Sequence, residues 1–292
     1  MGKGGTRTLT TGVDNLPGTG GNDTFIGDSA SASAADQLDG GAGTDTVKLY
    51  GAAALALPSM TSVEVVENYS NQNLDVSANA DVEQLWLYGT ATQSTGNVNQ
   101  TLGFADKAGG KALAGVFTSV TGSADAATVA VNAAGEAAAQ TSLTVAGIEA
   151  LTVNATGKNQ LGNLIAAAAE TITVTGEGTV NATLAPATTV LKSIDATANT
   201  GGVTLSLTDA QFGTNPIAIT SGAGKDSFTF TDAIGAKATV DLGAGDDSFT
   251  ITQGTTALTA ESVIAAGEGK DTLGLITTTT AINATSGAGL ER

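Results

Sequence analysis

Short runs in which apolar and polar residues alternate recur along this chain and predict its secondary structure. Two examples are residues 151–154 (Leu-Thr-Val-Asn) and 171–174 (Thr-Ile-Thr-Val), and such runs end at Gly, Asn or Asp. A period of two indicates β-strands with one buried face. Helical turns are expected at most in two alanine-rich segments, residues 125–139 and 164–170. The pattern therefore predicts an all-β chain of many short strands.

An acidic residue embedded in such a run recurs at a regular spacing in the centre of the chain. Glu64 and Glu83 are one period apart, as are Glu149 and Glu170, and three periods separate Glu83 from Glu149. A period of about 22 residues is typical of a solenoid with coils of that length, here a parallel β-helix on the order of 60 Å long. We interpret these glutamates as solvent-facing strand positions rather than metal ligands.

A glycine-rich loop that ends in aspartate and runs into an apolar strand occurs five times. Residues 40–48 fit the pattern G-G-x-G-x-D-x-U-x at every fixed position, and the other copies span 18–25, 222–228, 243–249 and 267–273. This nonapeptide is the signature of a calcium-binding parallel β-helix. Glycine permits positive φ, so carbonyl oxygens can turn inward, and aspartate adds a charged oxygen ligand. One loop supplies about half of the oxygens that calcium takes, so stacked loops would share an ion.

The sequence thus predicts calcium ligands in all five loops. The predicted ligand set is Gly18, Gly21, Asp23, Asp39, Gly41, Gly43, Asp45, Gly222, Gly224, Asp226, Gly243, Gly245, Asp246, Asp247, Gly267, Gly269 and Asp271. Within a cluster the loop aspartates recur once per period, or one per coil, so successive loops should lie along one edge of the solenoid. The alternative is that these loops are glycine turns with solvated aspartates.

Composition and charge narrow the possible chemistry. The chain has no Cys or His and carries 28 acidic against 11 basic residues, a formal net charge of −17. Without thiolate or imidazole the usual zinc, copper and iron sites are excluded, whereas oxygen ligands suit calcium or magnesium. A nucleophile activated by histidine is equally excluded, and we expect no enzyme. The charge disfavours nucleic acid and anionic membranes, and no apolar stretch approaches a membrane span.

The loop clusters divide the chain into five regions. These are an N-terminal extension (1–13), calcium-loop coils (14–50), a calcium-poor central β-solenoid (51–220), further calcium-loop coils (221–275) and a C-terminal tail (276–292). No signal peptide is visible at the start, because residues 1–7 are not followed by an apolar segment. Export would then use a signal elsewhere, such as one at the far end.

Residues 8–25 resemble a segment common in large secreted proteins of Gram-negative bacteria that carry RTX-type calcium repeats. Surface-layer proteins of the alphaproteobacterial kind are the closest in style. The resemblance is strong in both loop clusters. In the centre it extends only to the general richness in Ala, Thr and Val. It implies a β-solenoid exported by type I secretion, ordered by calcium and assembled into a lattice at the cell surface. The chain departs from the family's pattern in two ways. Its loops come once per coil rather than as uninterrupted tandem nonapeptides. No separate anchoring domain is visible, as would be expected of a fragment or a minimal member.

We therefore expect a secreted structural protein of the bacterial cell surface that binds calcium and polymerises with itself into an extracellular lattice or fibre. A cell-surface polysaccharide is the second partner considered. The alternative is a calcium-stabilised adhesin or ligand-binding module of a larger RTX protein, which exposed aromatics clustered on one face would support. Trp86 and Tyr88 alternate with leucines, and we interpret them as a packed edge rather than a contact site.

Overall fold

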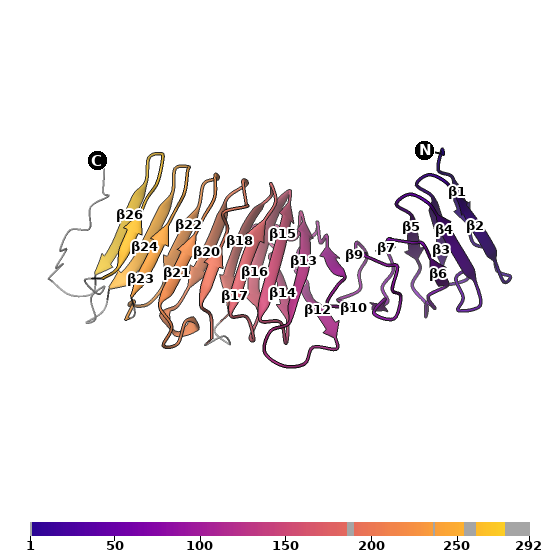
Figure 1. Cartoon of the computed structure of the whole chain (residues 1–292), viewed down its shortest axis with the longest axis horizontal. Coiled ribbons are helices and arrows are strands. Elements are labelled where there is room, and N and C mark those ends of the chain that lie inside the picture. The colour runs from indigo at the N-terminus through magenta and orange to yellow at the C-terminus, as the bar shows by residue number, and fades with distance from the viewer. Residues whose placement is uncertain (1, 186–189, 236, 254–260, 278–292) are drawn as a thin grey trace.

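The chain forms a parallel β-solenoid of about 12 turns with roughly 22 residues per turn, which confirms the predicted fold class. The computed structural model describes residues 2–185, 190–235, 237–253 and 261–277. Successive coils stack along the long axis, so the first and last coils lie at opposite ends of an elongated molecule (Figure 1). Within the described residues the only helical element is the short 3-10 helix η1 (Asp209–Gln211). None of the described helices is long and apolar enough to cross a membrane.

Three parallel sheets line the solenoid, and each coil contributes one strand to the longest of them. The thirteen-stranded sheet contains, in spatial order, β1 (Thr6–Thr8), β3 (Thr24–Asp28), β5 (Thr46–Tyr50), β7 (Val65–Asn68), β9 (Gln84–Leu87), β11 (Thr101–Phe104), β13 (Ala126–Asn132), β15 (Ala150–Thr156), β17 (Thr171–Thr175), β19 (Ser193–Asp195), β21 (Ile217–Thr220), β23 (Ala238–Asp241) and β25 (Val263–Ala265). The ten-stranded sheet contains β8 (Leu74–Asp75), β10 (Gln93–Asn97), β12 (Ala112–Thr118), β14 (Thr141–Val145), β16 (Lys158–Ile165), β18 (Thr179–Leu184), β20 (Val203–Leu207), β22 (Ser227–Phe230), β24 (Ser248–Gln253) and β26 (Thr272–Thr277). The three-stranded sheet contains β2 (Asn15–Thr19), β4 (Gln37–Gly41) and β6 (Ser59–Thr61).

Inward-facing side chains form columns along the solenoid because the strands pair in register. One column of the thirteen-stranded sheet runs Phe25, Val47, Val66, Leu85, Leu102, Val129 and Val153, all fully buried. Burial of each such side chain contributes about 1.5–3 kcal/mol. The expectation of helical turns in the alanine-rich segments is wrong, since 126–132 forms β13 and 164–165 ends β16. Stacking between coils overrides the helix preference of alanine there.

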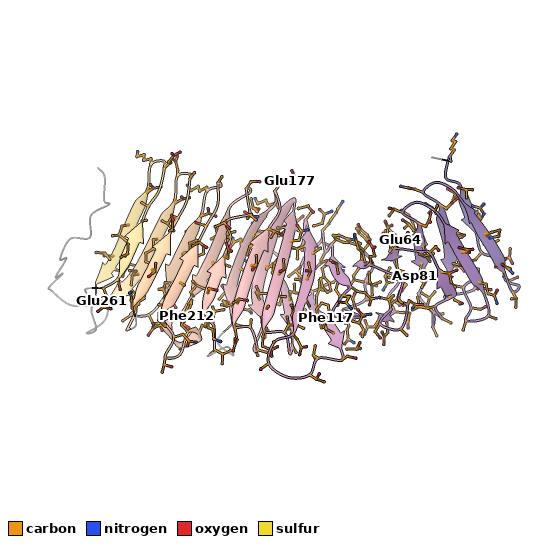
Figure 2. The ribbon with its side chains drawn as sticks, in the orientation of Figure 1. Glu64, Asp81, Phe117, Glu177, Phe212 and Glu261 are labelled. Carbon is orange, nitrogen blue, oxygen red and sulfur yellow. The ribbon has the colours of Figure 1, made fainter. Side chains whose placement is uncertain are left out.

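The two loop clusters occupy different connections of the coil. Asp23 and Asp45 lie where the chain passes from the three-stranded into the thirteen-stranded sheet. Asp226, Asp247 and Asp271 lie where it passes from the thirteen-stranded into the ten-stranded sheet. Loops therefore stack within each cluster, as predicted, but the clusters do not share one connection. The turn at Glu177, which enters the ten-stranded sheet, and the turn at Phe212, which leaves it, lie at opposite edges (Figure 2).

The predicted N-terminal extension and C-terminal tail compare differently with the structure. Residues 1–13 contain β1, whose Thr6–Thr8 pairs in parallel with β3, so this segment belongs to the first coil. Of the expected tail, residues 278–292 lie outside the described part of the chain.

Candidate metal centre

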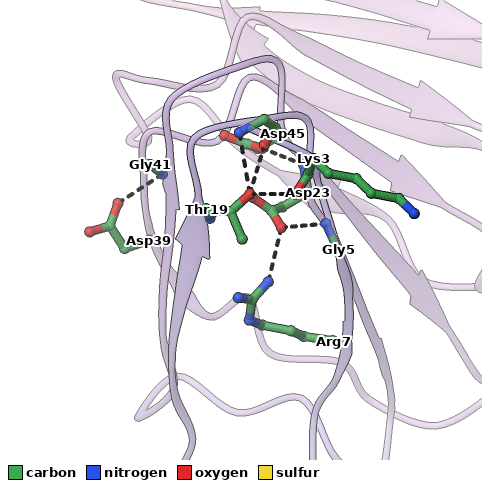
Figure 3. Close-up of polar contacts among 9 residues, drawn as sticks. Lys3, Gly5, Arg7, Thr19, Asp23, Asp39, Gly41 and Asp45 are labelled. Carbon is green, nitrogen blue, oxygen red and sulfur yellow. Dashed lines mark hydrogen bonds and ion pairs between the residues drawn. The ribbon is translucent and has the colours of Figure 1, made fainter. Parts of the chain in front are cut away.

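A ladder of hydrogen bonds joins the loop carboxylates of the first cluster. The backbone N–H of Asp23 donates to Asp45 Oδ1 over 2.6 Å, and the N–H of Asp45 donates to Glu64 Oε2 over 2.7 Å. The N–H of Gly5 donates to Asp23 Oδ1 over 2.7 Å (Figure 3). Each carboxylate thus satisfies a backbone donor of the preceding coil. Because a buried backbone N–H needs a partner, this ladder positions the side chains.

The second cluster repeats the same arrangement on its own connection. The N–H of Val203 donates to Asp226 Oδ1 over 2.7 Å, and the N–H of Asp226 donates to Asp247 Oδ1 over 2.7 Å. The N–H of Asp247 donates to Asp271 Oδ1 over 3.0 Å. The structure therefore brings together the loop aspartates that the sequence predicts as neighbours in successive coils.

Within the described part of the chain, three of these aspartates retain one carboxylate oxygen with no hydrogen-bond partner. Asp45, Asp226 and Asp247 are at most 1% exposed, and Oδ2 of each is buried without a partner. The hydroxyl of Ser221 and the backbone N–H of Gly222 lie near Asp226 and offset part of the rise in its pKa, although that hydroxyl donates to the carbonyl of Leu242 over 2.7 Å. Asp45 and Asp247 therefore lack donors more completely than Asp226. An unpaired charged oxygen in the interior is costly unless a positive group compensates it.

Burial raises the pKa of all three carboxyl groups. For Asp247, burial is the largest cause, the N–H of Asp226 offsets part of it, and the charges of Asp226, Asp271 and Asp246 add to it, so its pKa is about 6. Near neutral pH this group is therefore a buried anion whose ionised form the protein alone does not fully stabilise. A bound cation would supply the positive charge that stabilises the ionised carboxylate.

Asp23 differs because protein donors already satisfy both of its oxygens. Its Oδ2 accepts the N–H and the hydroxyl of Thr19, at 2.6 and 2.8 Å, and its Oδ1 pairs with Arg7 at 2.9 Å. Burial raises the pKa of Asp23, but these hydrogen bonds outweigh it and lower the pKa to about 2. In the next coil the partner of Thr19 is Gly41, which has no hydroxyl and whose N–H donates to Asp39 over 3.1 Å (Figure 3). Asp45 therefore lacks the donors that Asp23 has.

The remaining predicted acidic ligands lie closer to the protein surface. Asp39 and Asp246 are exposed, and Asp271 is half-buried. Asp246 Oδ1 accepts the N–H of Lys270 over 2.9 Å. Across the described residues, no group of three or more acidic side chains converges on one point. A cation at Asp45, Asp226 or Asp247 would therefore need main-chain carbonyl oxygens as its other ligands.

The predicted loop glycines serve two purposes. Positive φ angles between 78° and 148° are confirmed at Gly41, Gly43, Gly243, Gly245, Gly267 and Gly269. The other four, Gly18, Gly21, Gly222 and Gly224, are not in this region. There a Cβ would collide with the neighbouring coil, as at Gly18, where it would lie 1.9 Å from the carbonyl oxygen of Gly40. These glycines allow backbones of adjacent coils to approach.

Buried amides replace the carboxylates in the central coils, a feature that the sequence reasoning missed. The register that aligns Asp247 with Asp226 continues through Val203 and Val180 to Asn159. Asn159 is fully buried, and its Oδ1 accepts the N–H of Ala134 over 2.9 Å.

The second atom of that amide is a donor rather than an acceptor. Asn159 Nδ2 donates to the carbonyls of Thr156 and Thr179, both at 3.0 Å. In the first cluster's column, Gln100 likewise follows Glu64 and Glu83. Its Nε2 donates to the carbonyls of Val76, Asn79 and Val82 at 2.9–3.1 Å. Where a column holds one of these amides, its N–H groups donate to turn carbonyls, whereas Asp45, Asp226 and Asp247 have a second oxygen that cannot donate and has no partner.

Two central glutamates also belong to these ladders. Glu64 accepts the N–H of Asp45, and Glu149 Oε2 accepts the N–H of Asp125 over 2.8 Å. The interpretation of these two as solvent-facing positions alone is therefore wrong. The spacing of Glu64 could have revealed that it belongs to the hydrogen-bond ladder, because it follows Asp45 by close to the length of one coil.

The chain matches no family model, no curated protein and no solved structure. The fold and the site together define a parallel β-solenoid whose turns are held by columns of buried carboxylates and amides.

Proposed function

We propose that this chain is a calcium-ordered structural solenoid of the bacterial cell surface that assembles with further copies of itself. The observation that carries the calcium part is the buried, unpartnered Oδ2 of Asp247, with its counterparts at Asp45 and Asp226. These three carboxylates would hold the ions, and calcium would neutralise each buried charge and complete the turn. The proposed role is structural and involves no catalysis.

The ligand chemistry favours calcium over other cations. The chain has no Cys or His, so only oxygen ligands are available. A single carboxylate completed by glycine-loop carbonyls would form an irregular shell, which calcium accepts and magnesium, with its tight octahedral geometry, tolerates poorly. Loops of this kind suit the high calcium concentration outside cells, which is why we place the protein there, exported by a type I system.

The self-assembly part rests on the end of the solenoid and on its charge. Among the described residues β1 lies at the edge of the thirteen-stranded sheet, beside β3, and an edge strand can pair with a strand of another copy. Like charges would keep copies of a chain with a net charge of −17 apart. Calcium that bridges surface carboxylates would remove this repulsion and allow a lattice or fibre.

Thermal unfolding in calcium, in magnesium and in chelator tests the calcium part. We expect calcium to raise the melting temperature strongly and magnesium to raise it little, because ligands that bind only the folded state stabilise it. Asp39→Asn, which changes an exposed loop carboxylate, should respond to calcium like the wild type. A melting temperature that is the same in calcium and in chelator would refute the calcium assignment.

Light scattering and electron microscopy on the same samples test assembly separately. Calcium should produce sheets or fibres that dissolve on chelation. A monodisperse monomer that calcium nevertheless stabilises would refute self-assembly and leave the metal sites intact. That result would favour the second candidate, a calcium-stabilised ligand-binding module. A specific observation supports this second candidate, namely that all three tyrosines and the single tryptophan gather at three neighbouring strands of one sheet.

A further inference from the structure

The polar aromatic side chains form a ladder on the outer face of the thirteen-stranded sheet. Tyr50, Tyr69 and Tyr88 stand in register at or just after the ends of β5, β7 and β9. The rings of Tyr50 and Tyr69 stack at 4.7 Å and 8°, and those of Tyr69 and Tyr88 at 5.0 Å and 12°. Trp86 stacks on Tyr88 at 5.9 Å. These are all the Tyr and Trp residues of the chain, and the packed edge predicted at Trp86 and Tyr88 extends over the neighbouring coils to Tyr69 and Tyr50.

Neighbouring polar groups hold the ladder in place. The hydroxyl of Tyr69 donates to Glu67 Oε2 over 2.8 Å, and Lys48 pairs with the same oxygen at 2.9 Å. The indole N–H of Trp86 donates to Gln84 over 2.9 Å. The ring of Trp86 also lies against Gly103 of the next strand, where a Cβ would be 2.3 Å from it. The rings are therefore fixed before any ligand arrives, which lowers the entropic cost of binding.

The ladder ends at Tyr50, beside an open pocket. Tyr50 is 38% exposed, whereas Tyr69, Trp86 and Tyr88 are half-buried. On the side away from Tyr69, the register partner of Tyr50 is Asp28. No ring continues the stack there, because this partner is an aspartate. Its Oδ1 accepts the N–H groups of Ala30 and Ser31, both at 2.9 Å.

A pocket of about 370 Å³ occupies this position, a volume at the lower end of the range of small-molecule sites. Its lining combines the Tyr50 ring and the nonpolar Leu9, Ile26, Gly27 and Ala30 with the hydroxyl-bearing Thr8, Thr10, Thr11 and Ser31 and the carboxyl-bearing Asp28. It therefore offers one flat aromatic surface, further apolar surface and several hydrogen-bonding groups.

We propose that this pocket binds a sugar ring of a neutral polysaccharide, with the Tyr50 ring as its stacking platform. A pyranose has an apolar face of C–H groups, which an aromatic ring covers, and a rim of hydroxyls, which Asp28 and the threonines would bind. An acidic sugar is disfavoured by Asp28 and by the net charge of −17. An organic cation is disfavoured because cages for such ligands use several rings, and only one ring lines this pocket.

Affinity electrophoresis in gels that contain dextran, galactomannan or xyloglucan tests the proposal, with alginate as the acidic comparison. We expect at least one neutral polymer to retard the wild type in calcium-containing buffer. Tyr50→Ala should weaken that binding about tenfold, and Tyr50→Phe should retain it because the ring face remains. Val116→Ala is the matched control, since it removes a comparably exposed apolar side chain (37%) from the other long sheet.

The melting temperature of each variant in the same buffer establishes that it is folded, so loss of binding by Tyr50→Ala cannot reflect unfolding. Equal retardation of Tyr50→Ala and wild type overturns the proposal. So does a wild type that no neutral polymer retards, or that alginate alone retards. Retardation is scored against a gel without polysaccharide in the same buffer, so any slowing caused by polymer formation cancels and the outcome is distinguishable from those of the calcium and self-assembly proposals.

Discussion

Asn159 and Asp226 occupy the same column of the ten-stranded sheet, three coils apart, and each accepts a backbone N–H from the preceding coil. They differ in the second atom of the side chain. Asn159 Nδ2 donates to two turn carbonyls, whereas Asp226 Oδ2 is buried with no partner. A buried carboxylate oxygen without a donor is costly, and a positive group beside it would offset that cost. This comparison makes the calcium proposal testable by exchanging amide and carboxylate.

Asp247→Asn should have opposite effects with and without calcium. In chelator at neutral pH the variant loses a buried unpaired charge and gains donors like those of Asn159, so the free energy of unfolding should rise by about 1–3 kcal/mol. In calcium the variant loses a ligand and should be less stable than the wild type. Denaturant unfolding in both buffers measures the two differences. Stabilisation by the same amount in both would show that no cation acts at Asp247.

Calorimetric titration of calcium supplies a second readout for the same site. Asp247→Asn should weaken calcium binding more than Glu149→Gln, because the Glu149 carboxylate lies in a central turn outside the glycine loops. Equal losses from the two variants would indicate diffuse electrostatic attraction rather than a defined site.

Asn159→Asp is the reciprocal change. It should destabilise the metal-free protein by about 2–4 kcal/mol, because it places a buried carboxylate where two carbonyls have lost their donor. Calcium should recover part of that loss if the turn can accept the ion. Asn163→Asp, at an exposed position of the same strand, is the control for added charge. A loss no larger than that of the control would show that the amide donors are unimportant.

The pH dependence in chelator follows from the buried aspartates. The folded pKa of Asp247 is about 6, above its ordinary value of 3.8, so the folded state binds more protons between these values. Stability should therefore rise as the pH falls from 7 to 5, by about 1–2 kcal/mol from Asp247 alone, with Asp45 and Asp226 acting in the same direction. Asp23, whose pKa is lowered to about 2, contributes stability that is lost only at more acidic pH.

In calcium we expect the opposite pH dependence, with stability falling as the pH is lowered from 7 to 5, because protons would then compete with the ion for the carboxylates. Denaturant midpoints at pH 5, 6 and 7, each with calcium and with chelator, provide the measurement. A chelated protein that becomes less stable on acidification from 7 to 5 would contradict the unpaired state of these carboxylates.

Gly245→Ala should destabilise the protein by about 2–4 kcal/mol with or without calcium. Gly245 has a φ of 148°, and a Cβ would lie 1.9 Å from the carbonyl oxygen of Gly224 in the preceding coil. Gly20→Ala is the matched control in another loop, because nothing lies within 4 Å of the added methyl and its φ is not positive. It should change stability by no more than about 0.5 kcal/mol. Thermal unfolding distinguishes the two, and equal effects would show that the loops do not need close backbone contact.

The sequence by itself determined the class of fold and the placement of the loops. Period-two alternation, as in 171–174, and the repeat at one coil length are local signals, and both are kept in the fold because each coil pairs directly with the next one along the chain. The fully buried column from Phe25 to Val153 follows from them.

Only the tertiary structure decided which loop carboxylates are left unpaired. Asp23 and Asp45 sit in the same sequence pattern, yet Thr19 satisfies the first and Gly41, its partner one coil on, cannot satisfy the second. The amide in the Asp226 column and the tyrosine ladder likewise depend on side chains from separate coils. Such relations are set by the register between coils, which the spacing of a repeat approximates but does not specify, because a shift of one residue exchanges every neighbour.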